Sequence, residues 1–168
     1  LPVEHLLPQM ELDPAQAAAY SVFRAQGLRL YALIDAAANP QILPMLRNGQ
    51  CNYLALRTAD PKSEEFDPYL VLLPPKSALL ASLVAEGWNN RWGLYLTTEE
   101  GFRKLARHLQ ETLLAEMRPG GRLPQRFRDA LALENFYRSM SLLDRPKQFG
   151  PIFSFFTEDP KGMPFCAF

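Results

Sequence analysis

The residue types that most often carry catalysis are sparse in this chain, which has two histidines and two cysteines. His108 and Glu111 lie three residues apart in a stretch with helical periodicity, and carboxylate-bridged metal sites use this spacing. Such sites draw further Glu and Glu-x-x-His sets from neighbouring helices, and His5 is the only other histidine. A partly exposed His108 that packs beside the apolar stripe of its helix is the better interpretation. We therefore expect no metal and no other cofactor.

Cys51 is the second candidate for chemistry. Cys51, His108 and an acid could form a thiol triad, because the members of a triad need to be close in the fold and not in the sequence. No nucleophile motif surrounds Cys51, however, and it opens an apolar segment, which is typical of a small buried hydrophobe. The chain also has no G-x-S-x-G, H-E-x-x-H, P-loop or G-x-G-x-x-G pattern. A non-enzymatic protein is the first interpretation, and a small cysteine- or histidine-dependent hydrolase or transferase is the alternative.

A basic run with no acid until its end is the strongest candidate for binding. It comprises Arg118, Arg122, Arg126 and Arg128 and ends at Asp129. Guanidinium groups bind carboxylates through two parallel hydrogen bonds and are common at interface hot spots. The run therefore indicates a site for an acidic or carbonyl-rich partner. The alternative is a solvated loop in which Arg126 pairs with Asp129 or Asp35 to fix a strand to a helix.

Aromatic residues give two further candidates for partner binding. Trp88 and Trp92 flank Asn89 and Asn90 in a predicted turn; we expect Trp92 in the core and Trp88 as a partial interface anchor. Up to position 156, the phenylalanines of the C-terminal part follow the alternation of a strand, so we expect them in the core. Beyond Pro160 the chain is too short to build a core of its own. Phe165 and Phe168 therefore either pack back on the domain or add to a partner surface.

Length and composition restrict the class of protein. A chain of 168 residues fits one domain, here 1–168, and 18 basic residues against 18 acidic ones leave no excess charge for a nucleic-acid site. The apolar runs are far shorter than the roughly 20 residues that a membrane span requires. Neither cysteine is in a C-x-x-C pair, and no secretory leader opens the chain, although it begins at Leu1 rather than Met. We expect a cytoplasmic protein that binds no nucleic acid and has no membrane span.

Strand and helix patterns alternate along the chain. The predicted helices are 14–26, about 40–48, 77–87, 102–113 and a last one from 129, and the predicted extended segments are 28–34, 51–56, 69–73, 92–97, about 118–127 and 149–156. This alternation is typical of α/β architecture. We expect a mixed, mostly parallel sheet of four to five strands covered by helices. The core spans about 28–156, and 1–12 and 157–168 form irregular arms.

The helix that begins near 102 has the clearest signal. Thr97 stands three residues before Glu100, the spacing of a capping box in which each side chain bonds the other residue's backbone amide. Apolar residues then repeat at helical spacing over four turns. They are Phe102, Leu105, Ala106, Leu109 and Leu113.

Several short motifs, taken in order, resemble a known family. They are YALIDAAANP at 31, YLAL at 53, PYLVLL at 68, WGLYL at 92, FRKLARHLQETL at 102, RFRD at 126 and FGPI at 149. Their order is similar to that of the effector adaptor (chaperone) domain of bacterial type VI secretion systems, over roughly 28–156. Arg128 stands where this family usually has an aromatic residue, and Ala130 where it has proline.

The resemblance implies a non-enzymatic role. Adaptors of this family hold a toxic effector in the cytoplasm of the producing cell and help to mount it on the VgrG spike. The partners implied are a secreted effector protein and VgrG. A structural module that binds the spike alone, without toxin, is a further interpretation.

Overall fold

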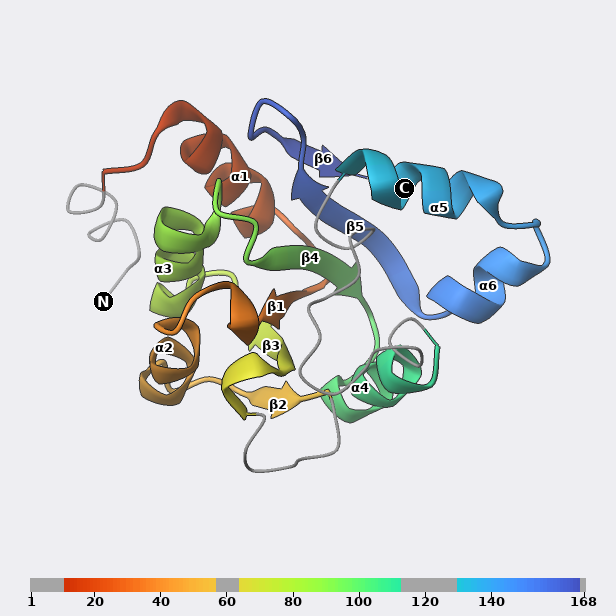
Figure 1. Ribbon diagram of the computed structural model, residues 1–168, viewed down its shortest axis with the longest axis horizontal. Coiled ribbons are helices and arrows are strands. Elements are labelled where there is room, and N and C mark those ends of the chain that lie inside the picture. Colours follow the sequence, from red (N-terminus) through yellow and green to blue (C-terminus); the bar gives the residue numbers. More distant parts are fainter. Residues whose placement is uncertain (1–10, 57–63, 113–129, 167–168) are drawn as a thin grey trace.

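The computed structural model describes residues 11–56, 64–112 and 130–166 (Figure 1). Helices α1, α2 and α3 lie on one side of the sheet in this view, and α4, α5 and α6 on the other. The elements are α1 (Pro14–Arg24), β1 (Arg29–Asp35), η3 (Ala36–Ala38), α2 (Ile42–Asn48), β2 (Tyr53–Ala55), η4 (Glu64–Phe66), β3 (Pro68–Leu73), α3 (Ala78–Gly87), β4 (Gly93–Thr98), α4 (Phe102–Glu111), α5 (Ala130–Ser139), α6 (Asp144–Phe149), β5 (Ile152–Glu158) and β6 (Pro164–Cys166).

The sheet corrects the expectation of mostly parallel strands. Within the described residues it has six strands in the order β2-β3-β1-β4-β5-β6. Every neighbouring pair is antiparallel, from β2 with β3 to β5 with β6. The alternation of strands and helices is present, but it does not produce a parallel sheet.

The reason is that each helical crossover skips one strand. Because β1 and β2 both run antiparallel to β3, they are parallel to each other, and α2 connects them across one strand position. Likewise, β3 and β4 lie on either side of β1 and are parallel to each other, and α3 connects them. The two units interleave, so each strand lies beside an antiparallel one. This is the split βαβ arrangement of ferredoxin-like folds.

Alternating side chains on the strands build a core on each face of the sheet. Leu30, Ala32 and Ile34 of β1 belong to the core under α1, α2 and α3. Tyr31 and Leu33, between them, belong to the core under α4 and α5. Because both faces are covered, β1 is buried along nearly its whole length.

The predicted start of a helix at residue 14 is confirmed, because α1 begins at Pro14. The Asp13 side chain accepts a hydrogen bond from the Gln16 amide at 2.8 Å, and the Gln16 side chain accepts one from the Asp13 amide at 3.0 Å. Pro14 occupies the first turn, where its missing N–H costs nothing. The Gln16 side chain also donates to the carbonyl oxygen of Ala85 at 2.9 Å, which joins α1 to α3.

The C-terminal arm is more regular than expected. β5 continues to Glu158, and β6 returns beside it, with Phe156 opposite Cys166 and Glu158 opposite Pro164. The segment expected to be irregular thus forms a hairpin at one edge of the sheet. The N-terminal arm falls mostly outside the described residues, which begin at Glu11.

Candidate partner-binding site

Most of the predicted binding residues lie outside the part of the chain that the structure describes. This holds for Arg118, Arg122, Arg126, Arg128, Asp129 and Phe168. Phe165 lies on β6, with its backbone paired to Thr157 of β5. The binding role of these residues therefore stays a prediction.

Trp88 lies in the core, which corrects the expectation of an interface anchor. It is 1% exposed, and its ring contacts Phe23 edge-on at 5.5 Å between ring centroids. Its indole Nε1–H donates to the carbonyl oxygen of Gly162 at 2.6 Å. Trp88 therefore fastens the β5–β6 hairpin to the core instead of facing a partner. Trp92 is also buried, as expected.

Cys51 and His108, the residues on which an enzymatic function would depend, contact different elements of the fold. The half-buried Cys51 thiol lies 3.6 Å from the carbonyl oxygen of Leu46 in α2. Nε2 of His108 lies 2.7 Å from the carbonyl oxygen of Gln148 in α6. The described residues show no contact between Cys51 and His108, and they contain no group of three potential metal ligands. The structure gives the thiol triad no support.

Burial raises the pKa of the Cys51 thiol, which opposes the activation that a nucleophile needs. In a variant with Cys166→Ala, we expect Cys51 of the folded chain to react with a disulfide reagent more slowly than in urea, between about pH 7 and 9. Absorbance of the released thiol measures the rate. A folded chain that reacts faster than the unfolded one would restore the nucleophile interpretation.

A pocket of about 540 Å³ lies beside the edge strand β2 and the first turn of α4. Its lining includes Cys51, Asn52, Tyr53, Leu54, Phe102 and Arg103. Aromatic and aliphatic side chains with one guanidinium suit a group that is apolar at one end and carboxylate at the other. No sequence pattern marks Leu54 or Arg103, because the pocket arises only from the placement of α4 beside β2.

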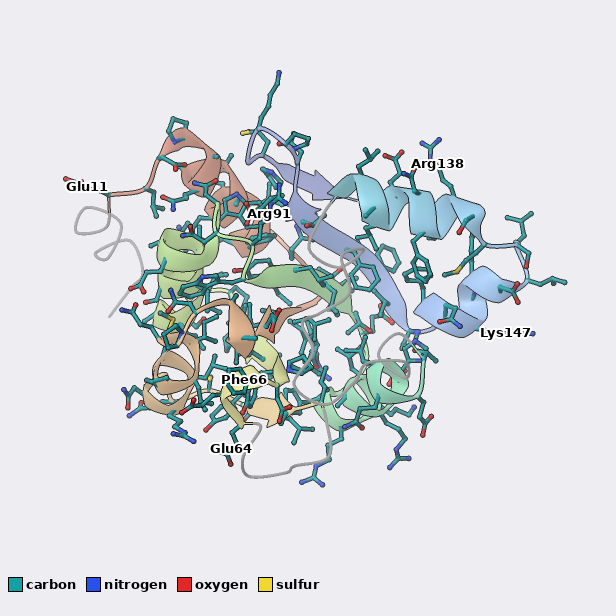
Figure 2. All side chains as sticks on the ribbon, viewed as in Figure 1. Glu11, Glu64, Phe66, Arg91, Arg138 and Lys147 are labelled. Carbon is teal, nitrogen blue, oxygen red and sulfur yellow. The ribbon has the colours of Figure 1, made fainter. Side chains whose placement is uncertain are left out.

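Helices α5 and α6 carry a second surface. Leu133 of α5 is fully buried in the core on this face of the sheet. Leu131 at the start of α5 is 61% exposed, and Leu142 and Leu143, between the two helices, are 78% and 79% exposed. Figure 2 shows Arg138 and Lys147 pointing outward from the same helix pair. Leu142 and Leu143 could not be predicted from the sequence, because they lie between the two helices and follow no helical repeat.

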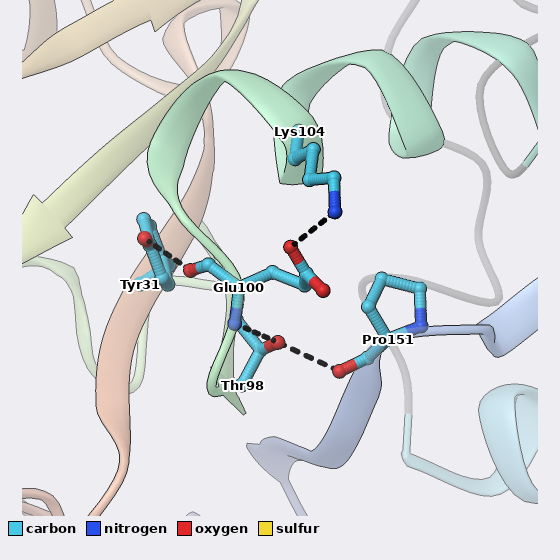
Figure 3. A network of polar contacts seen from close by, with 5 residues as sticks. All are labelled: Tyr31, Thr98, Glu100, Lys104 and Pro151. Atoms are coloured by element: carbon cyan, nitrogen blue, oxygen red, sulfur yellow. Dashed lines mark hydrogen bonds and ion pairs between the residues drawn. The ribbon is translucent and has the colours of Figure 1, made fainter.

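A polar network fixes the start of α4 to two strands (Figure 3). Thr98 accepts a hydrogen bond from the Glu100 amide at 3.0 Å and donates to the carbonyl oxygen of Pro151 at 2.6 Å. The Tyr31 hydroxyl donates to the carbonyl oxygen of Glu100 at 3.0 Å. The expected capping box of Thr97 is therefore wrong. The Thr97 hydroxyl instead bonds Ser154 within the sheet, and Gly101 is the N-cap residue.

Fold and surface define an antiparallel α/β domain with exposed apolar side chains suited to protein contacts. No helix among the described residues has the length and apolar character to cross a bilayer. Residues 30–146 match the family model described as a domain of unknown function, DUF4123, and the chain belongs to this family. The family is generally associated with effector adaptors of type VI secretion systems. Comparisons with curated proteins and with solved structures gave no match.

Proposed function

We propose that the protein is a non-enzymatic adaptor that binds a type VI secretion effector in the cytoplasm of the producing cell and helps to load it onto the VgrG spike. The observation that carries this proposal is membership of a family associated with such adaptors, over residues 30–146. The secreted effector and VgrG are the two protein partners.

The surface of the domain supports a role in protein binding. Leu142 and Leu143 are the most exposed of the large apolar side chains that the structure describes, and exposed apolar groups are common where proteins meet. They extend from a helix pair whose buried side, at Leu133 and Phe149, is anchored in the core. A rigid base beneath exposed leucines lowers the entropy lost on binding.

The basic run is proposed as the main contact for the effector. Its guanidinium groups, from Arg118 to Arg128, suit acidic or carbonyl-rich surfaces. Asp129 and the aromatic residues Phe165 and Phe168 are proposed to extend this contact.

Co-expression with the toxin encoded beside the gene tests the proposal. The expected result is a stoichiometric complex that elutes as one peak in size-exclusion chromatography. A chain that elutes alone in the presence of every neighbouring effector and of VgrG contradicts the adaptor function. Elution with VgrG but with no toxin would instead indicate a structural module of the secretion assembly.

Arg126→Glu is expected to weaken the effector complex by at least about tenfold, because it replaces a carboxylate-binding group with a like charge. Lys76→Glu is the matched control, since Lys76 is an exposed residue between β3 and α3 and undergoes the same change of charge. Titration calorimetry measures the affinity, and thermal unfolding is recorded for both variants. Lost binding together with a lowered melting temperature would show that Arg126 is structural.

A further inference from the structure

Among the strands that the structure describes, β2 lies at one edge of the sheet. It is the terminal strand in the order and pairs on one side with β3. The amide of Leu56 donates to the carbonyl oxygen of Pro68, and the amide of Leu72 to that of Asn52, both at 2.9 Å. Every second residue of this segment therefore directs its backbone groups to β3, namely Asn52, Leu54 and Leu56.

This register turns the backbone groups of Tyr53 and Ala55 away from β3. In an antiparallel pair, the residues between hydrogen-bonded positions direct both N–H and C=O to the other side. No backbone partner for these groups is found in the part of the chain that the structure describes. Such an edge is a template for another extended strand.

The pocket next to this edge adds side-chain recognition. Leu54 is 40% exposed and lies on the sheet face that α4 covers, opposite the buried Leu70. Phe102 and Arg103 of α4 complete the wall on that side. Figure 1 shows α4 beside the end of β2. A strand added to β2 would continue the sheet, so its side chains on this face would lie over the pocket.

Arg103 is the charged side chain in the lining of the pocket, and it is exposed. Its neighbour Lys104 pairs with Glu100 at 3.5 Å, whereas Arg103 has no ion pair among the described residues. A carboxylate is the natural complement of a free guanidinium beside an apolar surface. Side chains two residues apart on a strand share one face, so an apolar and an acidic residue at this spacing would fill the pocket together.

We propose that the edge of β2 binds an extended segment of the effector by strand addition. An apolar side chain of that segment enters the pocket beside Leu54 and Phe102, and an Asp or Glu two residues away bonds Arg103. Backbone bonds to Tyr53 and Ala55 supply affinity, and the pocket supplies selectivity. The inference rests on the proposed adaptor function and adds a second contact to that of the basic run.

Ala55→Pro tests the backbone bonds. Proline removes the outward N–H and is tolerated on edge strands, because the bonds to β3 come from other residues. Ala55→Val is the matched control, since it keeps the N–H and favours a strand. With the co-expressed effector as the probe, we expect Ala55→Pro to weaken the complex about tenfold or more relative to Ala55→Val.

Arg103→Glu tests the pocket. Arg107→Glu makes the same change of charge one turn further along α4, on an exposed residue that does not line the pocket. We expect Arg103→Glu to weaken the complex and Arg107→Glu to leave its affinity unchanged. Equal affinity of the two variants would contradict a carboxylate at Arg103.

Hydrogen exchange of the wild-type complex separates this inference from the adaptor function. Protection of residues 51–56 in the complex, together with the Ala55→Pro effect, supports strand addition. A complex that forms without this protection and without the effect overturns the inference and leaves the adaptor function standing. Failure to form any complex removes both. A chain that is dimeric alone, and monomeric as Ala55→Pro, would show that a second copy occupies the edge and would also overturn the inference.

Discussion

Gly93→Ala is expected to lower the free energy of unfolding by at least about 3 kcal/mol. Gly93 begins β4 and lies opposite Ile34 in the register with β1. A Cβ atom at this position would stand 1.9 Å from the carbonyl oxygen of Leu33 and 2.9 Å from its carbonyl carbon. Because backbone atoms of the central strand make the clash, no rotation of a side chain can relieve it. The pairing of β1 with β4 must shift.

Urea denaturation followed by circular dichroism measures the change. Gly27→Ala is the control, because a Cβ at Gly27 meets no atom within 4 Å and the expected change is no more than about 1 kcal/mol. Equal stability of the two variants would mean that β1 and β4 are not paired in this register. The experiment therefore tests the antiparallel order at its centre.

The sequence located β1 to β5 well because each is a short apolar run, whereas β6 lies in the arm that was expected to be irregular. The segment 28–34 was expected and β1 is Arg29–Asp35; 69–73 was expected and β3 is Pro68–Leu73. The direction of pairing was not predictable in the same way. Periodicity describes one strand at a time, and strands that skip a neighbour show the same alternation with helices as strands that do not. Only the contact of β1 with both β3 and β4 distinguishes the two arrangements.

The proposed binding surfaces were harder to predict for a similar reason. Trp88 beside two asparagines suggested an exposed turn, yet its ring is enclosed by Phe23 and Tyr95 and its indole N–H bonds Gly162. Those contacts join distant parts of the chain and leave no local pattern. The edge of β2 likewise depends on strand order, and the pocket on where α4 begins.

One glycine of the hairpin turn illustrates how these distant parts meet. Gly162 has φ of 79°, in the left-handed region that glycine adopts at little cost. A Cβ there would stand 2.6 Å from Oδ1 of Asn89, whose amide group donates to Asp13 at 2.6 Å. The hairpin turn, the α3–β4 turn and the start of α1 thus meet at a place where the sequence shows only separate turn signals.

Thr98→Val is expected to lower the free energy of unfolding by about 2 kcal/mol. The substitution keeps the shape of a fully buried side chain and removes its hydroxyl. The Glu100 amide then loses its acceptor and the Pro151 carbonyl oxygen loses its donor, because the one hydroxyl serves both. The start of α4 would separate from β5.

Thr98→Ser identifies the cause of that loss. Serine keeps both hydrogen bonds and removes only a methyl group, which is worth about 1 kcal/mol of burial. We expect Thr98→Val to be the less stable variant in urea denaturation, and we expect faster amide exchange at the start of α4 in Thr98→Val alone. A greater loss in Thr98→Ser would assign the stability to packing of the methyl group. The first turn of α4 also supplies Phe102 and Arg103 to the pocket beside β2. We therefore expect Thr98→Val to weaken the proposed strand addition of the effector at this pocket, although Thr98 itself is buried and does not line it.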